Sequence, residues 1–268
     1  MWTLGDIMSG AWRTKLALAA GLSPNRQTCR DRVAALIDRL RPQRTAVPLV
    51  RLGPQRDGGY LVPDSLLGIA ACFSPGVGRQ SGFELDCAKR GIDVHMADGS
   101  VEGPSEPHPR FNFLRKHIGL WDSSETITLD SWIDSAGIGC QDDLILQMDI
   151  EGLEYLALAA LSLRRLGQCR FLVVEFHELH MLWNGPHFEV MEAVFGKILA
   201  SHACVHIHPN NSSRIYRRHG IGVPSIMEFT FARRRDTEIA GKWNQFPHVL
   251  DRPNLEHKPH IVLPNCWR

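Results

Sequence analysis

Continuous apolar runs alternate with amphipathic stretches through the middle of the 268-residue chain. The runs that predict buried strands are 68–73, 92–97, 110–114, 144–148 and 171–176. Apolar positions recur at helical spacing over 83–90, 153–163 and 188–199. Strands that are apolar on both faces and separated by helices are typical of a parallel sheet covered on both sides. The pattern therefore predicts an α/β, doubly wound domain.

Two more strands, 203–208 and 225–232, are joined by a polar connection that has no helical pattern. We expect this pair to be a hairpin that adds one antiparallel strand at the edge of a mostly parallel, seven-stranded, Rossmann-like sheet. Residues 1–45 show apolar steps of three and four residues, which predict an N-terminal helical appendage that could support a homo-oligomer. The main domain is then 46–232, and the Pro- and His-rich residues 233–268 are expected to cover it.

Charge and cysteine content narrow the class of protein. With 30 Lys+Arg against 29 Asp+Glu, the chain lacks the basic excess of a dedicated nucleic-acid binder. Its 7 cysteines are scattered without a CxxC pair, which argues against a disulfide framework or a zinc ribbon and indicates a reducing, cytoplasmic location. No membrane span is expected, because the early apolar stretch from Leu16 to Leu22 is far short of the roughly 20 residues that a bilayer requires.

The first predicted strand runs into a glycine-rich loop, Ser74 to Gly82, that leads to a helix. Gly76 and Gly78 allow a sharp turn and a close approach of the backbone to a ligand. Asp98 closes the second strand, where a carboxylate can accept hydrogen bonds from a ribose diol. These features together predict a nucleoside-bearing cofactor over the first two strands. The spacing, GxGxxxG, is one residue longer than the dinucleotide motif GxGxxG, and a simple tight turn with Asp98 as a loop cap is the alternative.

Several segments of the chain resemble a known family. The segments 73–78, 82–84 and 94–98 look like the cofactor loop of FkbM-type S-adenosylmethionine-dependent methyltransferases, which have the class I methyltransferase fold. The block Gln-Met-Asp-Ile-Glu-Gly-Leu-Glu at 147–154 is the most specific likeness, and 173–177 is similar to the strand that follows it. The resemblance implies S-adenosylmethionine as cofactor, with contacts from the following residues: Ser74, Gly76, Gly78, Asp98, Gly99, Ser100 and Asp149.

The chain also departs at two positions from the sequence pattern of the methyltransferases that it resembles. Many class I methyltransferases carry an acidic residue where this chain has Ser74, and lysine is common where Gln147 stands. We therefore expect the cofactor to contact Asp98 and the loop amides rather than the Ser74 side chain.

Three residues near the expected transfer site are candidate catalytic groups. Asp149 ends an otherwise apolar strand and could orient or deprotonate the acceptor, although capping the helix near Gly152 is an alternative role. His177 ends the next strand and has a side chain whose ordinary pKa suits a general base. Glu151 is a catalytic candidate only because the resemblance implies it. Without the resemblance, Glu151 and Glu154 would be expected to stabilise the N-terminus of the following helix through its dipole.

A divalent metal is the alternative way to activate an acceptor hydroxyl. Two ligand sets are possible from the sequence, either Asp149, His177 and His208 or Asp149, Glu175 and His177. Tyr60, His208 and Asn210 are expected to bind the substrate.

The resulting hypothesis is O-methylation of a polyhydroxylated small molecule or glycan by in-line transfer, with Asp149 and His177 as base or metal ligands. Two alternatives stay open, an NAD(P)-dependent oxidoreductase and a non-catalytic module that binds a nucleoside cofactor. The first would explain the glycine loop and Asp98 but gives the 147–154 block no role.

Overall fold

The structure is a computed structural model that describes residues 26–78 and 80–268. The first part of the expected N-terminal appendage, residues 1–25, and Arg79 of the glycine loop lie outside the described residues.

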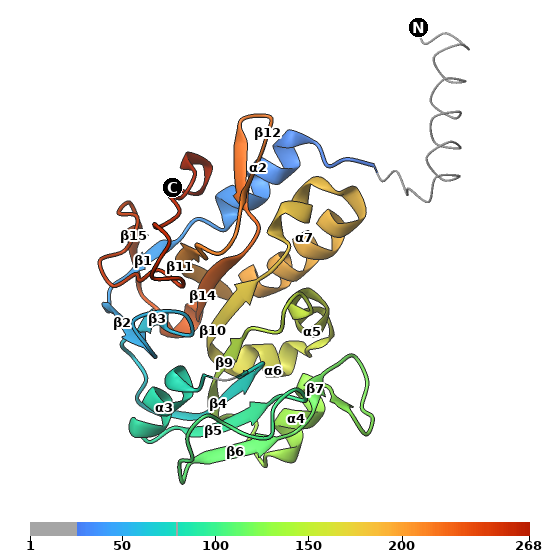
Figure 1. The fold of residues 1–268 in the computed structure, drawn as a ribbon, viewed down its shortest axis with the longest axis vertical. Coiled ribbons are helices and arrows are strands. Elements are labelled where there is room, and N and C mark those ends of the chain that lie inside the picture. The colour runs from blue at the N-terminus through green and yellow to red at the C-terminus, as the bar shows by residue number, and fades with distance from the viewer. Residues whose placement is uncertain (1–25, 79) are drawn as a thin grey trace, which may run out of the picture.

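A seven-stranded sheet forms the centre of the domain (Figure 1). Its strand order is β11-β14-β10-β9-β4-β5-β6, and every strand except β14 runs parallel to the others. The bounds are β4 Ile69–Pro75, β5 Asp93–Ala97, β6 Phe111–Leu114, β9 Asp143–Met148, β10 Cys169–Phe176, β11 His202–Pro209 and β14 Met227–Arg233. The predicted doubly wound α/β fold with seven mostly parallel strands is confirmed.

The antiparallel strand β14 differs from the prediction in its position. It lies between β10 and β11 and pairs with both, so that β11 is the edge strand. All seven residues of β14 are buried, which agrees with a central position, although Glu228, Thr230 and Arg233 among them are polar. The connection before it is also more ordered than expected, because β12 (Ile215–Arg218) and β13 (Ile221–Pro224) form a separate antiparallel pair.

Helices cover the two faces of the sheet unequally. Five lie on one face and share a core with it: α2 (Arg30–Arg39), α4 (Leu129–Ser135), α5 (Glu154–Ala160), α6 (Leu163–Gln168) and α7 (Gly185–Leu199). The other face packs against α3 (Gly82–Lys89) and the antiparallel pair of β2 (Leu49–Leu52) and β3 (Tyr60–Pro63). The predicted helix over 153–163 is confirmed as α5 but ends at Ala160, and α6, which was not predicted, begins at Leu163 after an extended Ser162.

Short elements complete the chain: β1 (Gln43–Thr45) with β15 (Ile239–Lys242), β7 (His117–Ile118) with β8 (Thr126–Ile127), and the 3-10 turns Leu179–Trp183, Arg234–Asp236 and Asn265–Trp267. The C-terminal segment returns to the main sheet, where the Asn254 amide donates hydrogen bonds to Glu228 at 2.8 Å and Asp57 at 3.0 Å. Within the described ranges, no helix combines the length and apolar character needed to cross a membrane.

Candidate active site

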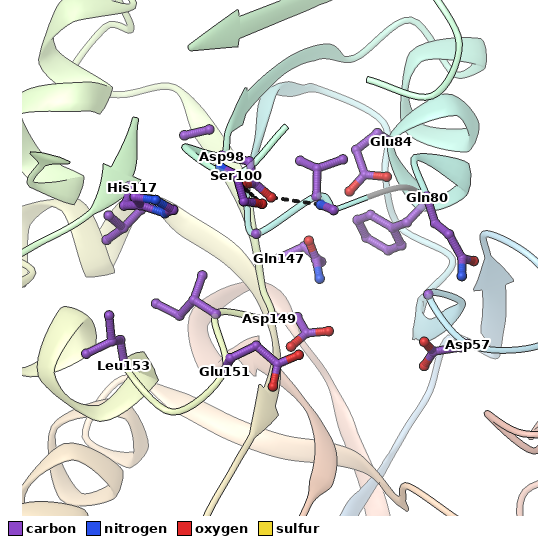
Figure 2. Close-up of a pocket in the computed structure, with 18 of the residues that line it drawn as sticks. Asp57, Gln80, Glu84, Asp98, Ser100, His117, Gln147, Asp149, Glu151 and Leu153 are labelled. Atoms are coloured by element: carbon purple, nitrogen blue, oxygen red, sulfur yellow. Dashed lines mark hydrogen bonds between the residues drawn. The ribbon is translucent and has the colours of Figure 1, made fainter. Parts of the chain in front are cut away.

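A cavity of about 510 Å³ opens at the carboxyl ends of β4, β5 and β9, near the point where the chain reverses its direction of travel across the sheet. Open α/β sheets bind ligands at such a switch point, because the loops on either side diverge there. Figure 2 shows the labelled side chains from several elements pointing into this space. The lining residues used below are Asp57, Tyr60, Gly76, Gly78, Glu84, Asp98, Ser100, Gln147, Asp149 and Glu151.

The glycine loop is held against the end of β9 by close backbone packing. Gly76 has φ +81°, and a Cβ on it would lie 1.8 Å from the Asp149 carbonyl oxygen, so no other residue fits there. Gly78 also has a positive φ, of +55°, but a Cβ there would have no neighbour within 4 Å. The loop is therefore fixed at Gly76, and its Gly78 end faces open space.

Asp98, at the end of β5, ties this loop to the next one. Its carboxylate accepts the Gly78 amide at 2.9 Å on one oxygen, and the Ser100 amide at 2.7 Å and hydroxyl at 2.6 Å on the other (Figure 2). Burial alone would raise the pKa of Asp98, but the hydrogen bonds from Ser100 and Gly78 outweigh it and hold that pKa below its ordinary value. Asp98 is therefore ionised and ordered before any ligand arrives, and the carboxylate still faces the cavity.

Ser74 lies behind the cavity wall, because its side chain is completely buried. Its hydroxyl is 2.5 Å from Glu84 Oε1 and 2.5 Å from Gln147 Oε1, and both of those residues line the cavity. Burial raises the pKa of Glu84 to about 7, although the Ser74 hydrogen bond acts in the opposite direction. An acidic group thus reaches this corner from α3 instead of from the end of β4, and Ser74 positions it. Gly99 has a similar indirect role, since a Cβ on it would meet the His117 ring at 2.4 Å.

Across the cavity, His177 is surrounded by carboxylates. Its Nε2 lies 3.4 Å from Glu151 Oε2, 3.8 Å from Glu175 Oε1 and 3.9 Å from Asp149 Oδ1. Burial alone would lower the pKa of His177, but the hydrogen bond to Glu154 and the neighbouring carboxylates outweigh it and raise that pKa above its ordinary value. The structure thus brings together the predicted residues Asp149, Glu151, Glu175 and His177.

Glu154 orients this histidine. It is completely buried, and its Oε1 lies 3.1 Å from His177 Nδ1 while also accepting the amides of Ile150 and Gly152. The expected dipole role of Glu154 is therefore secondary to a hydrogen-bonding one. Asp149 does not cap α5, because the residue that precedes the helix is Leu153 and no side chain caps it.

Several carboxylate oxygens at this end are left without partners. Asp149 Oδ1 and Glu175 Oε2 are buried and accept no hydrogen bond from the described residues. Burial, reinforced by neighbouring carboxylates, raises the pKa of Asp149 to about 7, although His177 acts in the opposite direction. Burial likewise raises the pKa of Glu175 well above its ordinary value. Buried oxygens without hydrogen-bond partners cost free energy, so the polar groups at this end of the cavity are less well satisfied than Asp98 at the other end.

The residues predicted to bind substrate separate in the structure. Tyr60 lines the cavity beside Phe83, with ring centroids 5.7 Å apart. His208 does not join the cluster, because it is buried next to Asp251, with Nδ1 and Oδ2 3.4 Å apart. Asn210 also lies outside the lining and donates to Glu175 Oε1 at 2.9 Å, so it supports that carboxylate from behind.

Sequence reasoning missed three lining or supporting groups, Asp57, Glu84 and Glu154. Glu84 and Glu154 each sit in the first turn of a helix that follows a strand end, where an acidic residue is ordinary and gives no distinct signal. Asp57 precedes the Gly58-Gly59 pair and reaches the cavity only because the C-terminal segment holds it through Asn254. Long-range contacts of that kind leave no local pattern.

Comparison with known proteins gives a family model and several distantly similar solved structures, among them the following two. Residues 94–203 match the family model described as the methyltransferase FkbM domain. A proposed DNA modification methyltransferase encoded within a prophage (E. coli) has 11% identity and a TM-score of 0.38, over 62% of this chain and 47% of its own. A proposed RNA methyltransferase from Pyrococcus horikoshii has 9% identity and a TM-score of 0.31, over 76% of this chain and 99% of its own. No curated protein matches this sequence significantly.

The matched region begins in β5 and ends in β11, so it contains Asp98, the Asp149 to Glu154 block and His177. The resemblance carried by the Asp149 to Glu154 block is thereby confirmed, and residues 94–203 are similar to an FkbM-type methyltransferase domain. The glycine loop precedes the matched region.

Proposed function

We propose that this protein is an S-adenosylmethionine-dependent O-methyltransferase that acts on a hydroxyl of a polyhydroxylated small molecule or glycan. The observation that carries the proposal is one cavity lined both by the anchored glycine loop with Asp98 and by Asp149 and Glu151. The carboxylates of Asp149 and Glu151 lie 3.9 and 3.4 Å from His177 Nε2. One end has the groups that a nucleoside requires, and the other has the groups that handle a proton.

The cofactor end fits S-adenosylmethionine by the chemistry of its side chains. Asp98 can accept hydrogen bonds from the ribose hydroxyls, and Gly78 leaves open space beside it. Glu84, with Ser74 and Gln147, offers an acidic group for the ammonium of the methionine portion. When bound, this cofactor supplies a methyl group that is activated for displacement by its attachment to a sulfonium sulfur.

The acceptor end supplies alignment and proton handling. An alcohol is a poor nucleophile while it keeps its proton, so the acceptor hydroxyl has to meet a group that lowers its pKa or takes the proton. Asp149, whose backbone packs against Gly76 of the cofactor loop, and His177, 3.9 Å from its carboxylate, are our candidates for this role. Glu154 holds the His177 ring, so that Nε2 faces Asp149 and Glu151. A hydroxyl-rich acceptor suits a wall of carboxylates and amides, because each of these groups can accept its hydrogen bonds.

Calorimetry on the purified chain tests the cofactor first. S-adenosylmethionine and S-adenosylhomocysteine should both bind, and NAD should not. Tight binding of NAD without a response to the sulfur ligands would favour a nicotinamide oxidoreductase and overturn the proposal.

Methyl transfer is tested next, with methyl-labelled S-adenosylmethionine and a panel of sugars, polyols and glycans. Label in a hydroxyl-bearing acceptor is the expected result. Cofactor binding with no transfer to any acceptor class would instead support a binding module.

A further inference from the structure

The cluster around His177 Nε2 has a shortage of positive charge. Three carboxylates, Asp149, Glu151 and Glu175, approach one imidazole nitrogen, and a fourth, Glu154, contacts the other nitrogen. No Lys or Arg among the described residues forms an ion pair with any of these four. Grouped carboxylates with one imidazole cannot all stay ionised without a compensating cation.

We propose that this cluster is a binding site for a divalent cation of the Mg²⁺ or Mn²⁺ class, held by Asp149, Glu151 and His177 with Glu175 beside them. The proposal rests on the proposed function for its role, which is to lower the pKa of the acceptor hydroxyl. It differs from the sets predicted from the sequence, because Glu151 takes part and His208 does not.

The spacing of the ligand atoms fits an ion better than a hydrogen-bonded pair. One ligand atom each from Asp149, Glu151 and His177 lie within 4.8 Å of one another. Adjacent ligands of an ion bonded at about 2.0 to 2.6 Å are separated by roughly 2.8 to 3.7 Å. The separations of 3.4, 3.8 and 3.9 Å from Nε2 are close to this range and longer than a charge-assisted hydrogen bond of about 2.8 Å.

Buried carboxylate oxygens without partners belong to this cluster. Asp149 Oδ1, 3.9 Å from His177 Nε2, is buried and accepts no hydrogen bond from the described residues. The Glu175 side chain is 4% exposed, and its Oε2 is likewise unpartnered. Its other oxygen, Oε1, lies 3.8 Å from Nε2 and accepts the Asn210 amide, which fixes this carboxylate beside the cluster.

The surroundings of the histidine also match a metal ligand. A histidine that binds a metal through one ring nitrogen usually donates the other N–H to a carboxylate or carbonyl, which sets the tautomer and the ring plane. Glu154 Oε1, 3.1 Å from Nδ1, occupies that position. Asp149 and Glu151 line the cavity, so an ion here would have open coordination positions for acceptor oxygens.

Binding of Mn²⁺ to the full, cofactor-free chain tests the site directly. Titration calorimetry, together with the electron paramagnetic resonance of unbound Mn²⁺, should show one site per chain. Glu151→Gln should weaken binding at least about tenfold, because a charged ligand is lost. The Glu151 side chain is 86% exposed, so the variant should fold, which circular dichroism checks.

Glu178→Gln is the matched control. Glu178 also has a left-handed backbone, with φ 53° against 56° for Glu151, and a largely exposed side chain, but it lies outside the cluster. This variant should bind Mn²⁺ like the wild type. The inference is overturned if the wild type takes up no Mn²⁺, or if the two variants bind it equally well. Titration of the same metal-free protein with S-adenosylhomocysteine reports separately on the proposed function.

Discussion

The two ends of the cavity differ in how far their polar groups are satisfied. At the cofactor end, Asp98 receives hydrogen bonds from Gly78 and Ser100 and is ordered in advance. At the acceptor end, oxygens of Asp149 and Glu175 have no donor among the described residues, although both are buried. A preorganised region binds without much rearrangement, whereas an unsatisfied region is stabilised when its ligand arrives. The comparison separates the groups that we propose to hold the cofactor from those that we propose to act on the acceptor.

The largest effect on turnover should follow from substituting residues at the acceptor end of the cavity. Asp149→Asn and His177→Ala should each lower turnover about 10²- to 10⁴-fold, because the acceptor proton loses its acceptor or the ion loses a ligand. The S-adenosylhomocysteine affinity of His177→Ala, measured by calorimetry, should stay within about threefold of the wild type. A parallel loss of cofactor affinity would show that the two ends do not act separately.

The next effect concerns the packing that joins the two ends. Gly76→Ala places a Cβ 1.8 Å from the Asp149 carbonyl oxygen, so the loop or β9 has to move. We expect a loss of at least about 2 kcal/mol in the free energy of unfolding, measured with urea, along with loss of cofactor affinity. Gly78→Ala is the control, since it has a positive φ but open space, and should cost about 1 kcal/mol. Equal stability of the two variants would contradict the close packing.

Asp98→Asn should weaken S-adenosylhomocysteine binding by about 10- to 100-fold. Asparagine has the same size as aspartate, but its NH₂ group must face either the Gly78 amide or the Ser100 donors. An NH₂ group cannot accept a hydrogen bond from either, so one of these contacts is lost. Calorimetry with His177→Ala as the comparison variant measures the difference. An Asp98→Asn protein with unchanged affinity would mean that the ribose binds elsewhere.

Glu84→Gln should have a smaller and more selective effect. It should weaken S-adenosylhomocysteine binding about tenfold and leave 5′-methylthioadenosine unaffected, because the second ligand lacks the ammonium group. Ser74 can still hydrogen-bond the new amide, so the corner keeps its packing. An equal loss for both ligands would indicate a structural role for Glu84 instead.

The smallest effect is a dependence of stability on acid. Because the pKa of Asp98 is lower in the folded protein than in the unfolded chain, its contribution is complete above about pH 5. It is lost as the pH falls below about 4 toward the lowered pKa, since the unfolded chain then binds the proton first. Urea unfolding between roughly pH 5 and 2.5 should show a steeper decline for the wild type than for Asp98→Asn. Parallel plots of unfolding free energy against pH for the two proteins would show that Asp98 does not cause the acid sensitivity.

Much of the fold follows from local sequence signals. The apolar runs and the glycine pair located β4, β5, β9 and β10, because buried parallel strands cannot contain many polar residues. The position of β14 could not be predicted in this way, because Glu228 and Thr230 alternate with Met227, Phe229 and Phe231, and such an alternation gives no sign of which strands lie on either side.

Site residues that directly follow a strand could be predicted from the sequence. Site residues whose position depends on contacts with a distant segment could not. Asp98, Asp149 and His177 follow their strands directly, and parallel strands bring those ends together. His208 also ends a strand, but Asp251 in the C-terminal segment contacts it, and the intervening β14 separates it from β10. The partnership of Ser74 with Glu84 depends on how α3 packs, which the spacing of residues does not reveal.

The place of β14 in the sheet has a consequence for the order of synthesis. A ribosome produces β11 before β14, yet β11 pairs with the main sheet only through β14. The strands β6, β5, β4, β9 and β10 can assemble while the chain is still growing, whereas β11 has to wait until residue 233 has been made. The last two strands then join as a hairpin, and Asn254 follows to bring Asp57 to the cavity. The part of the cavity lined by Asp57 is thus finished among the last parts of the newborn chain.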